Sequence, residues 1–252
     1  MNIFYAIIFF ILGSSLASFY GVVATRLPLH ESIVKPRSHC MKCHHALSWY
    51  ELIPVFSFLF LRGKCSKCHS KLSIAEPLLE LFTGLCFAFF YLKYGISYSF
   101  FMSLILISLL DLIFISDFNY MIILDSPLVI SAILIFLLRW VYFGIEEAFL
   151  YVGYGILMFL FMLIIGFIGS ILFKREALGG GDIKLSFIVG MAVGVPYGFI
   201  TLILSTFLAL PYATFSLLSN TSKEVPFGPF IISSLCIVFL FYDKFSYILQ
   251  LI

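Results

Sequence analysis

The chain reads Gly179-Gly180-Gly181-Asp182-Ile183-Lys184 where a polar loop meets an apolar run. A carboxylate at the mouth of a membrane helix is energetically costly, so its presence there suggests a function. The glycines beside it allow another backbone or a peptide to come close. We therefore predict that Asp182 is half of a catalytic pair, whose second carboxylate lies elsewhere in the chain.

The composition around this stretch is that of a membrane protein. Of the 252 residues, 62% are hydrophobic and only 11% are charged, and apolar runs of about 18 residues or more recur, as in transmembrane helices. We predict an all-α polytopic membrane protein of about eight transmembrane helices. The lipid bilayer is then one partner, and nothing in the sequence points to nucleic acid. The predicted spans are residues 3–25, 77–92, 99–116, 126–142, 148–173, 183–195, 198–219 and 228–249.

The first apolar run is predicted to stay in the mature chain as residues 1–25, the first transmembrane helix. A cleavable signal peptide is the alternative, because Ser15-Leu16-Ala17 could serve as a cleavage site, but no Lys or Arg precedes the run. A polar segment follows at residues 26–76, and residues 77–252 then form a seven-helix membrane domain.

Basic residues are concentrated in the polar segment 26–76, which holds eight of the fifteen Lys and Arg residues and all five His. The positive-inside rule places this segment in the cytoplasm. With eight alternating spans, only Lys93, Arg139 and Lys244 among the basic residues lie on the outer side. The charge distribution and the span count therefore agree.

Four cysteines lie in the polar segment as two CxxC pairs, Cys40 with Cys43 and Cys65 with Cys68. Two such turns can complete a tetrahedral four-sulfur zinc site, which is normally structural. Redox-active dithiols and unligated thiols remain alternatives, although stable disulfides are not expected in the cytoplasm. The adjoining histidines could also replace a cysteine as ligand. They are His44, His45 and His69.

Between the two CxxC pairs, residues 52–61 are strongly apolar. A segment this apolar is not expected to stand in water. It lies either on the membrane surface or against the helices.

Four carboxylates fall in or next to predicted spans: Asp111, Asp117, Asp125 and Asp182. The predicted topology brings the last three to one membrane face, with Asp111 about one and a half turns deeper than Asp117. Helix-end charge is the alternative, and it suits Asp125 best. Two carboxylates held close share a proton, so one can activate water while the other polarises a peptide carbonyl, as in aspartic proteases. No Ser-His-Asp, HExxH or GxSxG pattern offers another mechanism.

Ordered motifs run along nearly the whole chain: residues 17–28 at the end of the first span, the two CxxC turns, residues 76–84, a GxGD motif with an apolar residue and Lys at 179–184, and a PFGP turn at 226–229. In this set the chain resembles the bacterial prepilin peptidases, also called type IV leader peptidases. The family's first catalytic Asp is followed by six residues, Pro and Asp. Asp117 has this spacing, with Leu124 in place of Pro. The resemblance therefore implies Asp117 and Asp182 as the catalytic pair.

The resemblance also implies the substrate and the second activity. Family members cleave a short basic leader from prepilins or pseudopilins after a Gly, at the cytoplasmic face of the bacterial inner or plasma membrane. Many also N-methylate the new N-terminus with S-adenosylmethionine, and the zinc loop is tied to that activity. The residues that would bind the methyl donor are unknown from sequence. The Phe-rich, sparsely charged chain looks most like competence-type members. The GxGD residues expected to shape the site are Gly179, Gly181 and Lys184.

Two other functions match parts of the pattern. A polytopic transporter or assembly scaffold would use the Asp residues to carry ions, but transporters usually place charges near the bilayer middle and often contain repeats. A general intramembrane protease of the presenilin type shares the GxGD motif. It would not explain the zinc loop or the PFGP turn.

Overall fold

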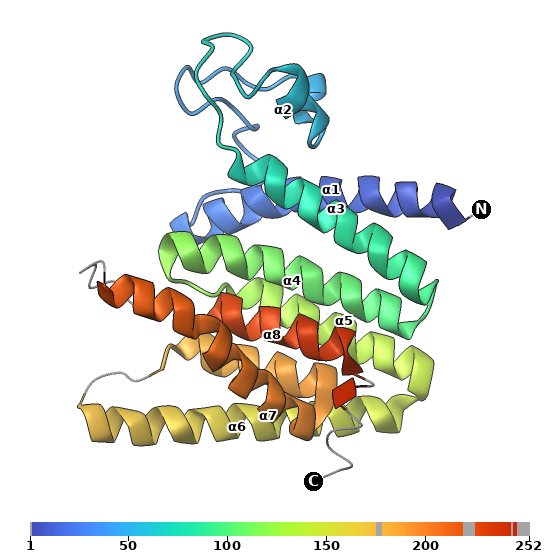
Figure 1. The fold of residues 1–252 in the computed structure, drawn as a ribbon, viewed down its shortest axis with the longest axis vertical. Coiled ribbons are helices and arrows are strands. Elements are labelled where there is room, and N and C mark those ends of the chain that lie inside the picture. Colours follow the sequence, from blue (N-terminus) through green and yellow to red (C-terminus); the bar gives the residue numbers. More distant parts are fainter. Residues whose placement is uncertain (1, 175–177, 219–224, 243, 246–252) are drawn as a thin grey trace. The chain divides into compact units, whose positions relative to one another are not determined.

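The structure is a computed structural model that describes residues 2–174, 178–218, 225–242 and 244–245. The regular secondary structure of the described part is helical, apart from two isolated bridges, His39 with Ala46 and Lys64 with Lys71. Figure 1 shows the helices in chain order. They are α1 Asn2–Arg26, η1 Leu27–Leu29, η2 Trp49–Leu52, α2 Phe56–Phe60, α3 Ala75–Tyr94, α4 Tyr98–Tyr120, α5 Asp125–Phe143, α6 Ile145–Phe173, α7 Gly180–Leu218 and α8 Gly228–Leu240.

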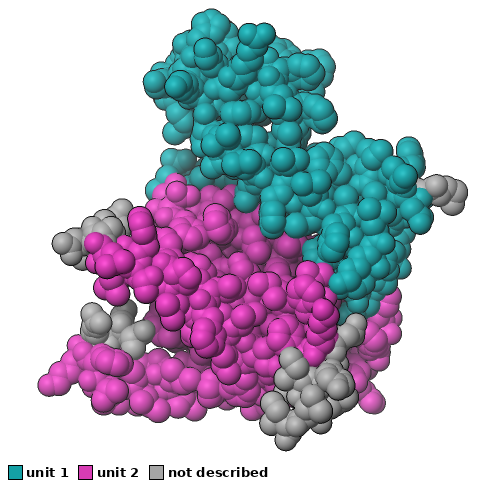
Figure 2. Space-filling view, viewed as in Figure 1, with its two compact units in different colours: residues 1–100 teal, residues 101–252 magenta. Residues whose placement is uncertain are grey.

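The chain groups into two compact units, residues 1–100 and 101–252 (Figure 2). The first unit contains α1, α3 and the polar segment between them. These two helices approach closely because each carries a glycine where they meet. A β carbon on Gly13 would lie 2.8 Å from the Phe87 ring, and one on Gly84 would lie 2.8 Å from the carbonyl oxygen of Phe10. Small residues at such contacts are a usual means of packing membrane helices.

The second unit contains most of α4 together with α5, α6, α7 and α8. Close packing of α6 on α7 again depends on glycine, because a β carbon on Gly190 would lie 2.7 Å from Cα of Gly155. Helix α7 is broken at Gly194, whose φ of 79° and ψ of 176° suit glycine almost alone. The predicted spans 183–195 and 198–219 are therefore two segments of one element. The break lies at Gly194, just before the turn that the sequence predicted at 195–198.

Six described helices are long and apolar enough to cross a membrane, namely α1 with η1, α3, α4, α5, α6 and α7. Helix α7 has 39 residues, and the break at Gly194 divides it into a shorter first segment and a longer second one. Helix α8 is apolar but spans 13 residues, and the end of the predicted span 228–249 lies outside the described residues. The all-helical, multi-pass architecture is confirmed, whereas the count of eight spans stays a prediction.

Candidate active site and metal centre

Asp117 lies in the last turn of α4 and is only 6% exposed. Its Oδ2 accepts a hydrogen bond of 3.2 Å from the backbone N–H of Gly228, the first residue of α8. The first N–H groups of a helix have no partner within the helix, and the helix dipole places partial positive charge there. The start of α8 is therefore a fitting environment for the negative charge of Asp117.

Asp182 lies in the first turn of α7, where its backbone N–H donates to the carbonyl oxygen of Gly179 at 3.1 Å. Its carboxylate is close enough to Asp117 for the two charges to act on each other. Oδ1 of Asp182 is buried and has no hydrogen-bond partner within the described part of the chain. Two acidic groups from helices far apart in sequence thus come together. Asp117 is hydrogen-bonded to the start of α8, and Asp182 has one carboxylate oxygen without a hydrogen-bond partner in the described structure.

Ile123, in the connection between α4 and α5, fills the space beside both acidic groups. A β carbon on Gly181 would lie 2.8 Å from Cβ of Ile123. One on Gly228 would lie 2.7 Å from Cδ1 of Ile123 and 2.9 Å from Oδ2 of Asp117. Sequence reasoning missed Ile123 altogether. The PFGP turn, which contains Gly228, was noted only as a family motif. It was the one sequence signal for the position of Gly228 in the candidate site.

Lys184 forms an ion pair with Asp125, with 2.7 Å between Nζ and Oδ1 and both side chains largely exposed. Asp125 begins α5, but the N-cap of that helix is Leu124, and no side chain caps it. Asp125 therefore bridges α5 to α7 instead of capping its own helix. Leu124 has φ −72° and ψ 129°, values that proline also adopts. The backbone at Leu124 is therefore compatible with the proline of the family pattern.

Asp111 is fully buried in α4. It lies six residues before Asp117 on the same helix. The Gly228 hydrogen bond and the Ile123 contacts described above involve Asp117 and not Asp111. The geometry therefore favours Asp117 as the residue that faces Asp182.

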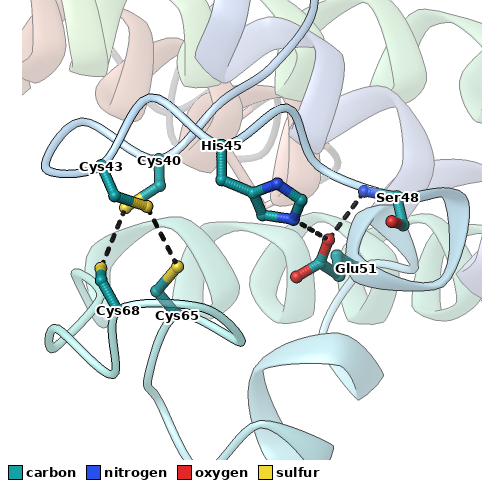
Figure 3. Close-up of polar contacts among 7 residues, drawn as sticks. All are labelled: Cys40, Cys43, His45, Ser48, Glu51, Cys65 and Cys68. Atoms are coloured by element: carbon teal, nitrogen blue, oxygen red, sulfur yellow. Dashed lines mark hydrogen bonds and ion pairs between the residues drawn. The ribbon is translucent and has the colours of Figure 1, made fainter.

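The four cysteine sulfurs of the polar segment face one another (Figure 3) and all lie within 4.8 Å. Sγ of Cys40 is 3.8 Å from Sγ of Cys68, and Sγ of Cys43 is 3.9 Å from Sγ of Cys65. A tetrahedral site with Zn–S bonds of about 2.3 Å separates its sulfurs by about 3.8 Å. The donor set and its spacing therefore fit zinc.

The two CxxC turns repeat the same backbone pattern 25 positions apart. Cys40 N–H donates to the carbonyl oxygen of His45, as Cys65 N–H donates to that of Ser70, each at 2.9 Å. His44 and His69 both have positive φ, 54° and 55°. Both turns also share the residues Cys-x-Lys-Cys-His, at 40–44 and 65–69, so the common backbone pattern accompanies a common local sequence.

Hydrogen bonds to sulfur favour the thiolate in parts of this cluster. Backbone N–H groups of Cys43 and Lys42 lower the pKa of Cys40 to about 6. The Ser70 hydroxyl, 3.2 Å from Sγ of Cys68, lowers the pKa of that thiol. At Cys43 a backbone hydrogen bond from His45 favours the thiolate, but burial and the neighbouring sulfurs outweigh it and raise the pKa to about 11.

His45 turns its ring away from the sulfurs towards Glu51 (Figure 3), with 3.4 Å between Nε2 and Oε2. Glu51 is buried and also accepts a 2.7 Å hydrogen bond from the Ser48 N–H. Burial raises the pKa of Glu51, but the hydrogen bonds from Ser48 and Ser66 and the charge of His45 outweigh it, so the pKa lies below its ordinary value. His45 thus pairs with Glu51, and the four cysteines are the group that could hold a metal ion.

Comparison with known proteins gives two adjacent family matches. Residues 11–94 match the bacterial peptidase A24 N-terminal domain, and residues 104–214 match the type IV leader peptidase family. The chain is 38% identical over 194 residues to the prepilin leader peptidase/N-methyltransferase of Bacillus subtilis, covering 75% of this chain and 73% of that protein. The chain belongs to the type IV leader peptidase family.

Other members of the leader peptidase family are similar over comparable lengths. The prepilin leader peptidase/N-methyltransferase of Vibrio cholerae is 33% identical over 225 residues, which is 83% of this chain and 85% of that protein. The enzyme of the same name from Myxococcus xanthus is 38% identical over 189 residues, or 74% of this chain and 55% of that protein. No solved structure gives a significant match.

Each of the two matched ranges contains one of the candidate sites. The first range contains all four cysteines of the cluster, and the second contains Asp117 and Asp182. Gly228 lies beyond both ranges. Its place beside Asp117 therefore rests on the hydrogen bond that the structure shows.

Proposed function

We propose that the protein is a prepilin or pseudopilin leader peptidase that uses Asp117 and Asp182 as an aspartic dyad. The observation that carries the proposal is the arrangement around Ile123. This side chain borders both Gly228, whose N–H donates to Asp117, and Gly181, the residue before Asp182, so α4 and α7 bring together two carboxyl groups 65 positions apart in sequence. The substrate class is supported by the printed names of the relatives. Cleavage after Gly at the cytoplasmic face is the family's expected reaction, and the basic polar segment supports that orientation.

The two acidic groups differ in a way that suggests their roles. The Gly228 N–H and the start of α8 stabilise the ionised form of Asp117. Asp182 has a buried oxygen without a partner in the described structure, a setting that suits the protonated form. Two carboxylic groups this close share one proton, so the roles belong to the pair.

In the proposed reaction Asp117 takes a proton from a water molecule whose oxygen attacks the scissile carbonyl carbon. Asp182 gives its proton to the carbonyl oxygen, so no free oxyanion forms. When the tetrahedral intermediate collapses, its C–N bond breaks and the proton on Asp117 passes to the leaving nitrogen. A hydroxyl proton returns to Asp182, which restores the starting state.

The dyad is tested by replacing Asp117→Asn and Asp182→Asn separately and following pseudopilin processing in membranes. Each change should lower the cleavage rate by about 10²–10⁴-fold, the usual loss when an acid–base group is removed. Glu146→Gln, which removes an exposed carboxylate in the first turn of α6, serves as the control. Processing by either Asn variant at the rate of the control would show that the dyad is wrongly assigned.

A second proposed activity is N-methylation of the new N-terminus with S-adenosylmethionine as donor. Its support is the name that the relatives carry, and we assign no residue to the methyl donor. Mass spectrometry of the processed substrate reads the cleavage position and the added methyl group together. An unmodified N-terminus in the presence of the donor would restrict the protein to proteolysis.

The four cysteines are proposed to hold a structural zinc ion. The ligands would be Cys40, Cys43, Cys65 and Cys68, whose sulfur spacing supports the assignment. A closed four-sulfur site leaves no open coordination position, so the ion would organise the polar segment and take no part in cleavage.

A further inference from the structure

Helix α2 presents its apolar face outwards. Phe56, Leu59 and Phe60 share one face of this short helix and are 51%, 64% and 83% exposed. Phe58, on the other side, packs against Gly63, where a β carbon would lie 3.0 Å from its ring. The helix therefore packs one aromatic ring, which is half-buried, against the loop and leaves its larger apolar face uncovered.

A hydrogen bond ties this helix to a membrane span. The N–H of Val55, the N-cap of α2, donates to Oε2 of Glu80 at 2.8 Å. Glu80 is buried and lies in the second turn of α3, whose neighbouring residues Leu81 and Phe82 face outwards. This hydrogen bond holds the start of α2 beside the first turns of a helix that itself exposes apolar side chains.

Val55 holds an unfavourable backbone conformation at this tether. Its φ is 62° and its ψ is −52°, a region that a β-branched residue rarely adopts. Such a residue persists only when the surrounding structure holds it there, and it often marks a functional position. Here it directs the chain from η2 into α2 while its N–H reaches Glu80.

The surroundings of α2 are strongly basic. Residues 32–75 contain seven Lys and Arg residues and a single carboxylate, Glu51, which is buried against His45. Trp49 and Tyr50, in the adjacent turn η2, are 75% and 49% exposed. Exposed aromatic and aliphatic side chains beside Lys and Arg are typical of segments that lie in the interface of an anionic bilayer.

We define the interfacial surface as the side chains of Trp49, Tyr50, Phe56, Leu59 and Phe60. We propose that this surface inserts into the headgroup region of an anionic bilayer. The leaflet is the one that α3 enters at its first turns. Five large side chains from two packed neighbouring turns, η2 and α2, are exposed, and a soluble loop would not leave so many in water. Continuity with the lipid-facing side of α3 and the positive charge both identify lipid as the partner, in preference to a second copy of the chain. The zinc loop would then lie on the membrane.

Trp49 offers a direct test, because the chain has only two tryptophans, Trp49 and Trp140. The full chain with Trp140→Phe is reconstituted into vesicles of phosphatidylcholine and phosphatidylglycerol, leaving Trp49 as the reporter. Fluorescence is then quenched either by lipids brominated near the headgroup or by aqueous iodide. A matched reporter carries Trp49→Phe, Trp140→Phe and Met41→Trp, at a loop position that is 85% exposed.

Brominated lipid should quench Trp49 at least about twofold more than the Met41→Trp reporter, and iodide should show the reverse order, because an interfacial segment is buried among acyl chains and headgroups. Quenching of Trp49 by iodide alone would overturn the proposal. Quenching by neither agent would also overturn it, because Trp49 would then be covered by protein, such as a second copy. Equal lipid quenching in vesicles of phosphatidylcholine alone would reject the anionic surface as partner.

A variant with two added negative charges tests the interfacial surface independently of the zinc site. Leu59→Glu with Phe60→Glu should abolish most of the quenching of Trp49 by brominated lipid and leave the bound zinc unchanged, whereas Met41→Glu should leave both unchanged. Full lipid quenching in the double variant would contradict the proposal. Because the Trp49 measurement on the otherwise native surface stands by itself, the test does not depend on how well the double variant folds.

Discussion

Asp117 and Asp182 meet because two residues beside them have no side chain. Gly181 and Gly228 both border Ile123, and a β carbon at either position would come within 3 Å of its side chain. Real β carbons do not approach other atoms so closely, so a substitution must move Ile123 or one of the helices. Gly180, between Gly179 and Gly181, has no atom within 4 Å of such a β carbon. A side chain would therefore be sterically hindered at Gly181 but not at Gly180.

Gly181→Ala should lower cleavage by about 100-fold, because a shift of about 1 Å in a catalytic group can cause a loss of that size. Gly180→Ala, the neighbouring change in open space, should cleave at nearly the native rate. Steady-state cleavage by both variants in detergent or membranes makes the comparison. Equal losses at the two positions would show that backbone flexibility, and not the Ile123 contact, is what the glycines provide.

Gly228→Ala should also lower the cleavage rate, by about 10- to 100-fold, because its β carbon would crowd Oδ2 of Asp117 and Cδ1 of Ile123. The additional change Ile123→Ala removes Cδ1 and should restore part of this activity. It should not rescue Gly181→Ala, since the atom nearest to that position is Cβ of Ile123. Rescue of both variants, or of neither, would contradict the geometry.

Helix α5 holds the first segment of α7 at both of its ends. This segment, residues 180–193, is about 21 Å long at 1.5 Å per residue, which is shorter than the roughly 30 Å hydrocarbon core of a bilayer. Its last carbonyl groups therefore need partners where water is scarce. Arg139 of α5 donates to the carbonyl oxygens of Met191 at 3.1 Å and Ala192 at 2.7 Å. Near the other end, the Asp125–Lys184 ion pair joins the same two helices.

Arg139→Ala should destabilise the protein by about 3 kcal/mol, because it removes two hydrogen bonds from a buried charged donor and leaves carbonyl groups unpaired. The change also removes the contact of the guanidinium with the Tyr151 ring, 3.2 Å from its centroid. Unfolding in a graded series of denaturing detergent measures the loss. Lys93→Ala, an exposed cation of α3, is the control, and unfolding of both variants at the same detergent fraction would refute this role.

At the scale of the whole molecule, the chain combines membrane helices with a polar loop that has almost no core of its own. In the polar loop, Cys40, Glu51 and Cys65 are buried, while most large apolar side chains are exposed. A segment this short needs a metal or an external surface to become ordered. The four-sulfur cluster and the proposed lipid contact supply these two supports.

Removal of zinc should therefore disorder the loop and leave the membrane helices folded. Cys43→Ser, or exposure to a strong chelator, should make residues 26–74 sensitive to limited proteolysis, with little change in helical circular dichroism. Cys86→Ser, which changes a cysteine of α3 outside the cluster, is the control for loss of a thiol. An equally resistant loop after complete zinc removal would mean that the metal does not organise it.

The amino-acid sequence determined the features that depend on local composition. Apolar runs locate membrane helices because a bilayer selects length and hydrophobicity, and the confirmed spans lie close to their predicted places. CxxC spacing indicated the sulfur cluster because two residues between cysteines bring both thiols to one side of a turn. Asp117 was assigned as the partner of Asp182 through the family resemblance, and their catalytic role stays a prediction.

Only the tertiary structure decided which distant groups meet. The sequence around Ile123 and Arg139 does not reveal their partners, and the PFGP turn around Gly228 marks a motif without naming Asp117, because each residue contacts an element far away along the chain. His45 was expected as an alternative ligand, and the fold instead directs it to Glu51. The break of α7 lies at Gly194, rather than in the turn at 195–198, and Arg139 donates to the carbonyl oxygens of Met191 and Ala192 just before it. Contacts of this kind depend on how helices pack in three dimensions, which local patterns do not encode.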